Sequence, residues 1–239
     1  MRQLYLVKTC VSFDIINGMK STQALRQQEL NLQKDRRRAT ILEAGWKLSL
    51  QKGLAALDMQ EVAGISQVSR ATLYRYFPSK KALAFGLLSW QTAEFVSPSY
   101  HAARQTFTGN GYEKFAQFLN QLLDSCRRFP DYYRFLGMVD FYYGDQESPA
   151  GLANLYQELF QDLLTGNSPD HYLTEGQHDG SVRPDLEPRL YTAMAIETIV
   201  SLGKQLALNR ESTRLIYGLE QSDILLKTAV EAILRASRK

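Results

Sequence analysis

The stretch Val68-Ser69-Arg70-Ala71-Thr72-Leu73-Tyr74-Arg75-Tyr76-Phe77-Pro78-Ser79-Lys80-Lys81 decides the fold of this chain. Ser69 is a good N-cap for a helix that runs to Tyr76, and the Pro-Ser pair that follows ends this helix and begins another. Only Val68, Leu73 and Phe77 have the character of core anchors. The remaining hydroxyl, guanidinium and ammonium groups are those that bind phosphates and base edges. The stretch therefore predicts a short helix that contacts a polyanion.

The residues before this stretch predict the two helices that support it. Helical periodicity begins at Arg36, and Gly53 ends the helix. The pattern Asp58-Met59-Gln60-Glu61 predicts a capping box, with Asp58 accepting from the amides of a second helix near 59–65 and Glu61 reaching back. A turn at 66–68 follows. A short helix, a tight turn and a further helix form the architecture that places one helix in the major groove of DNA.

Charge is concentrated in the same region. Residues 34–81 contain ten basic and four acidic side chains, an excess of six, whereas the whole chain has a net charge of +3. The remaining residues therefore sum to −3. This distribution favours a basic module that binds a polyanion, joined to a mildly acidic body. The alternative is an ordinary solvated charged face.

Residues 36–83 resemble the DNA-binding domain of the TetR family of bacterial transcriptional repressors. The resemblance rests on Gly53, on Val62-Ala63, on residues 68–80 and on Ala82-Leu83. It implies that the third helix reads the groove and that the side chains at the positions of Tyr74 and Lys80 hold phosphates. The chain departs from the family pattern where Ser66-Gln67 replaces Ala-Gly. Glycine suits a left-handed backbone at this turn, whereas a glutamine there costs about 1 kcal/mol. Gly64 within the second helix and Leu57 in place of a threonine are further departures.

The predicted site follows from the motif and the resemblance together. Arg70, Ala71 and Thr72 are expected to read the sequence, while Tyr74, Tyr76 and Lys80 are expected to hold the register on the backbone. Arg36 and Arg37 precede the first helix, as an arm that lies along the DNA would. The predicted DNA-binding residues are Arg36, Arg37, Ser69, Arg70, Ala71, Thr72, Tyr74, Arg75, Tyr76 and Lys80.

The rest of the chain also has the periodicity of helices, so the fold is predicted to be all-α. The further helices are expected at about 80–104, 112–128, 130–143, 149–164, 186–208 and 218–235, with a loop over 165–185 that includes one short helical piece. We expect a three-helix helix-turn-helix domain at 34–81 and a C-terminal helical effector-binding and dimerisation domain at 82–239. Residues 1–33 are expected to be a poorly ordered extension, in which Met19 would serve as a natural start.

The last two long helices are apolar on more than one face. Helices 186–208 and 218–235 therefore predict a second neighbour besides their own core, and the resemblance implies a homodimer that reads a palindromic operator in double-stranded DNA. A monomer that buries both faces internally is the alternative. Many aromatic residues lie between 107 and 160, where the resemblance implies a cavity for an unknown small-molecule effector. Ordinary core packing is the alternative, and no ligand-binding residue is nominated.

Enzyme motifs are absent from the sequence, which has no GxSxG, HExxH, P-loop or GxGxxG pattern. No catalytic residue, metal site or cofactor is therefore predicted, although His171 and His178 share a polar segment with acidic residues. Cys10 and Cys126 are isolated, which suits a reducing cytoplasm, and no apolar run is long enough to cross a membrane.

The predicted function is a cytoplasmic repressor that a small molecule releases from its operator. The alternatives are a DNA-binding protein of the same fold without an effector, and a helical protein–protein adaptor that has lost DNA binding.

Overall fold

The computed structural model describes residues 3–98, 102, 106–144, 154, 157, 168–218 and 223–239. These residues are almost entirely helical, and within them the β-structure is limited to an isolated bridge between Val182 and Arg238. The predicted all-α fold is confirmed. In the described part of the chain no helix is long and apolar enough to cross a membrane.

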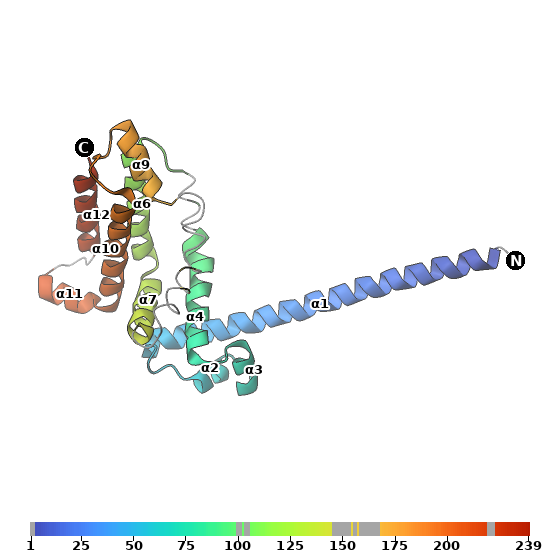
Figure 1. Cartoon of the computed structure of the whole chain (residues 1–239). Coiled ribbons are helices and arrows are strands. Elements are labelled where there is room, and N and C mark those ends of the chain that lie inside the picture. The colour runs from blue at the N-terminus through green and yellow to red at the C-terminus, as the bar shows by residue number, and fades with distance from the viewer. Residues whose placement is uncertain are drawn as a thin grey trace.

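The helices form a small N-terminal head and a larger body, and the N-terminal part of α1 projects far from both (Figure 1). The head contains α1 (Gln3–Lys52), α2 (Met59–Ile65) and α3 (Arg70–Tyr76), and α4 (Lys80–Gln91) leads from it into the π-helix η1 (Thr92–Val96). The body contains α6 (Gly111–Arg128), α7 (Pro130–Tyr143), α9 (Asp170–Asp179), α10 (Pro188–Leu208), α11 (Arg210–Tyr217) and α12 (Asp223–Ser237). The helix predicted at 149–164 lies outside the described residues, apart from 154 and 157.

The head folds around the apolar stripe of α1. Ile41, Leu42 and Leu48 are buried there, and α1 ends at Gly53, whose φ of +79° is the left-handed conformation that glycine adopts readily. Helix α1 runs without a break through the predicted boundary between residues 33 and 34. The domain limits, and the expected poor order of residues 1–33, stay predictions.

Only one of the two contacts of the predicted capping box is present at the N-terminus of α2. Asp58 Oδ1 accepts from the amides of Gln60 at 2.5 Å and Glu61 at 3.3 Å. The reciprocal contact predicted for Glu61 is wrong, because its carboxylate accepts from Lys52 Nζ at 2.6 and 2.8 Å instead. The ammonium group at the end of α1 adds an opposite charge and contacts both carboxylate oxygens, whereas the backbone amide would offer one neutral donor. This contact ties α1 to α2.

The turn between α2 and α3 contains the left-handed residue that the sequence predicts. Gln67 has a φ of 55°, and it is the one non-glycine residue with positive φ in the described part of the chain. Its amide donates to the Gly64 carbonyl, and the Val68 amide donates to the Ala63 carbonyl. These bonds hold the strained residue in place and set the angle between the two helices.

The element predicted at 80–104 is helical through residue 98, but it changes from an α-helix to a π-helix at Thr92. The sequence suggested one element from 80 to about 104, but α4 ends at Gln91 and continues as a π-helix. Thr92 accounts for the change, because its hydroxyl binds the Leu88 carbonyl at 2.9 Å and lies 3.0 Å from the Tyr132 hydroxyl. A threonine that bonds back to the preceding turn bends helices and weakens the regular ladder.

The body is built from closely packed helices. Asn110 and Glu113 form a capping box at the start of α6, and α9 is the helical piece predicted within 165–185. Close approach depends on glycines: a Cβ on Gly111 would lie 2.1 Å from the backbone nitrogen of Gly176, and one on Gly203 would lie 2.7 Å from Cys126 Sγ. Helix α11 was not predicted, although Asn209 before it and Gly218 after it, with φ +64°, are ordinary boundary residues.

Replacing Gln67 by glycine is expected to stabilise the protein. A left-handed side-chain-bearing residue costs about 1–2 kcal/mol, which exceeds the entropic cost of a glycine of about 0.5–1 kcal/mol. We expect a gain of about 0.5–1 kcal/mol, or roughly 2 °C in Tm by calorimetry. The matched variant Gly53→Ala introduces the same kind of strain where no atom crowds the Cβ, so it should lower Tm. A fall in Tm for Gln67→Gly would contradict the assignment of strain to the turn.

Candidate nucleic-acid interface

Helix α3 is fixed by few contacts and leaves most of its surface free. Ser69 Oγ caps it by accepting from the Thr72 amide at 3.1 Å, as predicted. Leu73 is its one buried residue, and Val68 packs partly against the core from the preceding turn. A seven-residue helix is unstable alone, so its orientation depends on these anchors and on the residues after its C-terminus.

The outward face of α3 presents the predicted readers. Arg70, Ala71, Tyr74 and Arg75 are exposed. The Arg70 guanidinium lies 5.6 Å from the centre of the Tyr74 ring, and the Arg75 guanidinium lies 5.9 Å from the Tyr76 ring. Aromatic faces stabilise and orient these cations while leaving their N–H groups available. The arrangement presents fork-shaped donors of the kind that bind guanine or a phosphate.

Ser69 and Thr72 have unequal roles. The Ser69 hydroxyl accepts from the Thr72 amide and donates to Thr72 Oγ1 at 3.0 Å, so its donor is used within the helix cap. Thr72 is half-buried, but its own hydroxyl proton is not used by this pair. The Ser69 donor is thus occupied within the cap, whereas the Thr72 hydroxyl proton is not used by this pair, and the contact of either residue with DNA stays a prediction.

The C-terminal end of α3 is seated by Phe77. Its ring is buried against Gly86 of α4, where a Cβ would lie 2.6 Å from Phe77 Cε1. The guanidinium of Arg38 from α1 lies 5.7 Å from the centre of the same ring. Because Phe77 directly follows α3, this contact joins α3 to both α1 and α4.

Lys80 has partners that the sequence did not predict. Its Nζ donates to the Ala55 carbonyl at 2.6 Å and lies 5.3 Å from the centre of the Tyr142 ring on α7. Lys80 is half-buried at the first turn of α4, where Ser79 Oγ accepts from the Ala82 amide. The residue thus links the head to the body, and its predicted contact with phosphate stays a prediction.

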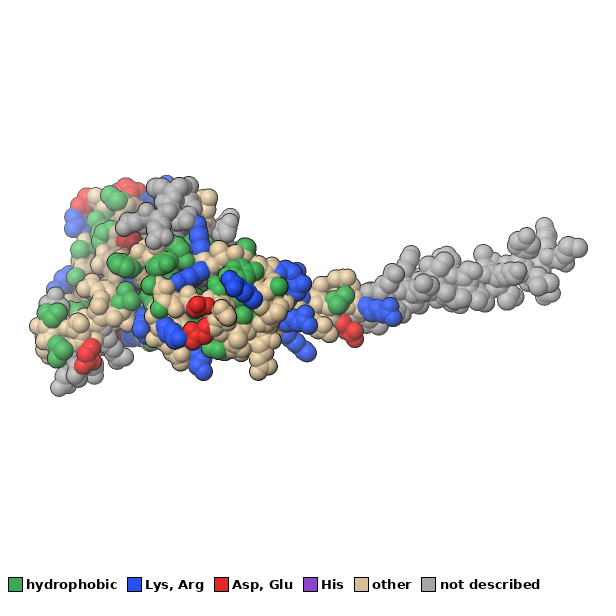
Figure 2. Space-filling view, turned by 90° about the horizontal axis from the view of Figure 1, so that it is seen from below, with side chains coloured by type: hydrophobic (Ala, Val, Ile, Leu, Met, Phe, Trp, Pro, Cys, Tyr) green, Lys and Arg blue, Asp and Glu red, His purple; other side chains and the backbone are tan. Residues whose placement is uncertain are grey.

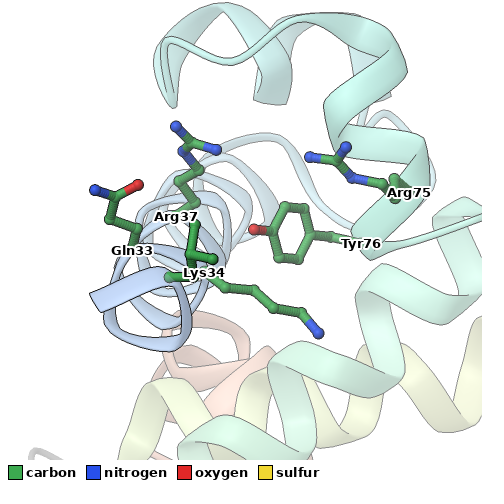
Figure 3. A pocket seen from close by; sticks show the side chains of 6 residues that line it. Gln33, Lys34, Arg37, Arg75 and Tyr76 are labelled. Atoms are coloured by element: carbon green, nitrogen blue, oxygen red, sulfur yellow. The ribbon is translucent and has the colours of Figure 1, made fainter. Parts of the chain in front are cut away.

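The two predicted arginines of α1 lie differently. Both are exposed, but Arg37 shares a pocket with Arg75 and Tyr76 of α3, and Arg36 is not among the residues that line it (Figure 3). The predicted flexible arm is wrong for this segment, because Arg36 and Arg37 lie within α1. The pocket also includes Lys34, which was not predicted as a site residue.

The face that contains α2 and α3 is rich in Lys and Arg side chains and poor in carboxylates (Figure 2). Asp58 and Glu61, two of the acids in the region, are used in the cap and in the pair with Lys52. The local excess of positive charge is therefore available to an anion approaching this face.

The buried polar groups of the body are held neutral. Burial raises the pKa of the Cys126 thiol to about 12 and that of the Tyr132 hydroxyl to about 12. Burial also raises the pKa of Tyr133, whose hydroxyl donates to Ser125 Oγ at 3.1 Å. A thiol with such a pKa is not an activated nucleophile. Among the described residues no group of three metal-binding side chains is found, and His171 and His178 lie on α9.

The head matches known regulators in sequence. Residues 41–87 match the family model described as bacterial regulatory proteins, tetR family. The chain is 40% identical over 50 residues to the HTH-type transcriptional regulator YuxN of Bacillus subtilis, covering 21% of this chain and 17% of YuxN. It is 42% identical over 65 residues to an HTH-type transcriptional regulator of Mycobacterium tuberculosis, covering 27% and 30%. The matches thus span less than a third of these relatives.

The fold of most of the chain also has a solved counterpart. The transcriptional regulator FadR from Bacillus subtilis, whose crystal structure is in complex with stearoyl-CoA, superposes with a TM-score of 0.57 at 17% identity. The superposition covers 83% of this chain and 98% of FadR. This likeness shows a common fold of an N-terminal helix-turn-helix head and a C-terminal helical body.

The geometry of the head and these matches define a helix-turn-helix domain of the class that binds DNA. The head of this chain is similar to the DNA-binding domain of the TetR family of bacterial transcriptional regulators, whose model matches residues 41–87. The resemblance of residues 36–83 to this family is confirmed.

Arg70→Ala is expected to weaken binding to a specific duplex by about 1–3 kcal/mol if Arg70 reads a base, with little effect on a random duplex. Fluorescence anisotropy with both duplexes measures the difference. An equal loss on the two duplexes would make Arg70 a phosphate contact instead.

Lys80→Ala is expected to reduce the slope of log K against log salt by about one unit on every duplex, because one phosphate contact releases about one counterion. It should also lower Tm slightly, since the bond to the Ala55 carbonyl is lost. An unchanged slope with a lower Tm would assign Lys80 to the joint between head and body alone.

Proposed function

We propose that this protein is a cytoplasmic repressor that binds a palindromic operator as a homodimer and is released by a small molecule. The observation that supports DNA binding most directly is the exposed, donor-rich face of α3. Arg70, Tyr74 and Arg75 stand on a helix that Leu73 and Phe77 fix to the core. A helix held rigidly with its forked donors exposed has the geometry of a helix that reads the major groove.

The homodimer is proposed to form through α10 and α12. Leu190, Met194 and Leu208 of α10 are 69%, 41% and 41% exposed, and Ile224 of α12 is 49% exposed. The spacing of Leu190, Met194, Ser201 and Leu208 places them along one side of α10. The Tyr191 hydroxyl donates to the Ile233 carbonyl at 2.6 Å, which holds the two helices as one unit. This paired, partly apolar surface suits a two-fold contact.

Control by a small molecule is supported by the contacts between head and body. Trp46 of α1 packs on Phe135 of α7 with ring centres 4.9 Å apart, and Phe85 of α4 packs on Tyr143 at 5.6 Å. A ligand that displaces α7 would therefore move the head. FadR is described with stearoyl-CoA, so long-chain acyl thioesters are the first compounds to test.

Most described aromatic residues of the body are core, as the simpler interpretation predicted. Phe115, Phe118, Tyr132, Tyr133 and Phe135 are buried. Phe141 is the exception, with 89% of its surface exposed. Tyr156 and Phe160 lie outside the described residues. We therefore propose no lining for an effector cavity.

Two alternative functions make different predictions. A regulator of the same fold without an effector would bind DNA but respond to no ligand. An adaptor that had lost DNA binding would not use the excess of positive charge on the head, and the unpaired donors of α3 argue against it.

Met194→Arg is expected to dissociate the dimer. It places an unpaired charge at the centre of the proposed contact, which costs about 2 kcal/mol or more. Sedimentation velocity should show a wild-type dimer that shifts with operator duplex, and a Met194→Arg monomer that binds the duplex weakly. Thr174→Arg, an exposed site on α9, is the matched control and should stay dimeric.

Two outcomes would contradict this proposal. A wild-type monomer would exclude the dimer, and a wild-type protein that does not shift with any duplex at low salt would favour the adaptor. A ligand that raises Tm in a screen but leaves the protein on its duplex would favour regulation without release.

A further inference from the structure

A pocket of about 330 Å³ lies where α1 passes α3. Leu30, Gln33, Lys34 and Arg37 line it from α1, and Arg75 and Tyr76 line it from α3. The four α1 residues have the spacing i, i+3, i+4 and i+7, which places them on one face of the helix. In Figure 3 the Tyr76 hydroxyl points from α3 toward α1, with Arg37 and Arg75 on one side of the ring and Lys34 on the other.

The chemistry of this pocket suits a single anion. Its lining contains three cations, one hydroxyl and one amide, and no carboxylate. Among the ion pairs of the described residues, none involves Lys34, Arg37 or Arg75. Cations gathered in one pocket repel each other, and an anion among them removes that cost. Arginine forks, an ammonium group and a tyrosine hydroxyl are the donors that bind phosphate oxygens.

We propose that this pocket binds one phosphate group of the DNA backbone, at the edge of the groove that α3 enters. The proposal rests on the proposed function. It assigns roles to Lys34 and Gln33, which lie before the first residue of the family match at 41. The segment of α1 beyond that match is thus part of the DNA interface of this chain.

The backbone of a duplex is favoured over a free phosphate by the position of the pocket. Arg75 and Tyr76 belong to the recognition helix itself, where Tyr74 directly precedes them and Arg70 lies more than one turn earlier. A phosphate held between α1 and the C-terminal end of α3 would fix how α3 sits in the groove. Leu30, which is 59% exposed, supplies an apolar wall against which a deoxyribose can pack.

Salt dependence of binding tests the pocket in the full-length chain. Lys34→Gln removes the charge and keeps most of the side-chain length, so the slope of log K against log salt should fall by about one unit on specific and random duplexes alike. Lys47→Gln makes the same charge change on an exposed site of α1 outside the pocket, and its slope should be unchanged. Both variants should keep the wild-type Tm.

A double variant tests whether one phosphate is shared. Arg75→Gln should reduce the slope by about one unit, and Lys34→Gln with Arg75→Gln should reduce it by about one unit as well, because the same phosphate is lost. A reduction of about two units would overturn the single-phosphate site.

Further measurements distinguish a phosphate of DNA from a free phosphate group, and failure of the pocket from failure of the proposed function. Titration calorimetry with inorganic phosphate at constant ionic strength should show no saturable binding. Saturable binding that Lys34→Gln abolishes, with an unchanged slope on DNA, would overturn the DNA role and assign the pocket to a free phosphate group. Wild-type binding to DNA with an unaltered Lys34→Gln slope overturns the pocket alone, whereas a wild-type chain that binds no duplex overturns the proposed function and the pocket with it.

Discussion

The contact of Phe77 with Gly86 is the constraint on which the rest of the DNA-binding head depends. The ring occupies the space that a Cβ at position 86 would need, and the guanidinium of Arg38 from α1 lies 5.7 Å from the ring centre. Helix α3 has seven residues and one buried side chain, so it cannot set its own orientation. The residue that follows it fixes the angle at which its exposed donors face outward.

Because Phe77 is seated on α4, whatever moves α4 also moves the recognition helix. Helix α4 packs on α1 at Gly45, where a Cβ would lie 3.4 Å from Leu83, and on α7 through the pair of Phe85 and Tyr143. It passes into a π-helix where Thr92 meets the buried Tyr132 of the same α7. Helix α4, which leads from the head, is thus in contact with α7 of the body. This contact is a physical route by which a change in the body can alter DNA binding.

Local chemistry explains which parts of the structure could be predicted from the sequence. The Ser69 cap, the end of α1 at Gly53 and the left-handed Gln67 each depend on a few neighbouring residues, and all three predictions are confirmed. The π-helix could not be predicted, because Thr92 meets a hydroxyl forty positions away. Neither could the pairing of Glu61 with Lys52, since the backbone amide of Asp58 is a nearer partner in the sequence. The observed helix boundaries also differ from the predicted ones where packing decides where a helix ends.

Part of the candidate site could likewise be predicted from the sequence, and part of it depends on the tertiary fold. The motif located α3 and its donors, but the pocket that joins Lys34 to Arg75 requires two helices to be placed in space. The spacing of Leu30, Gln33, Lys34 and Arg37 on one face of α1 is a signal for it, although the spacing alone does not identify the neighbour. Lys80 was located at the start of α4, but its contact with Tyr142 of the body depends on the tertiary fold.

Under the proposed function, two copies of this chain read a specific DNA sequence through α3. Selection of duplexes from a random pool by the full-length protein, followed by sequencing, tests it most directly. We expect enrichment of one motif with two-fold symmetry whose half-sites are about one helical turn apart, or a multiple of it. Recovery of duplexes without any common motif, at a salt concentration where the protein still binds DNA, would contradict it.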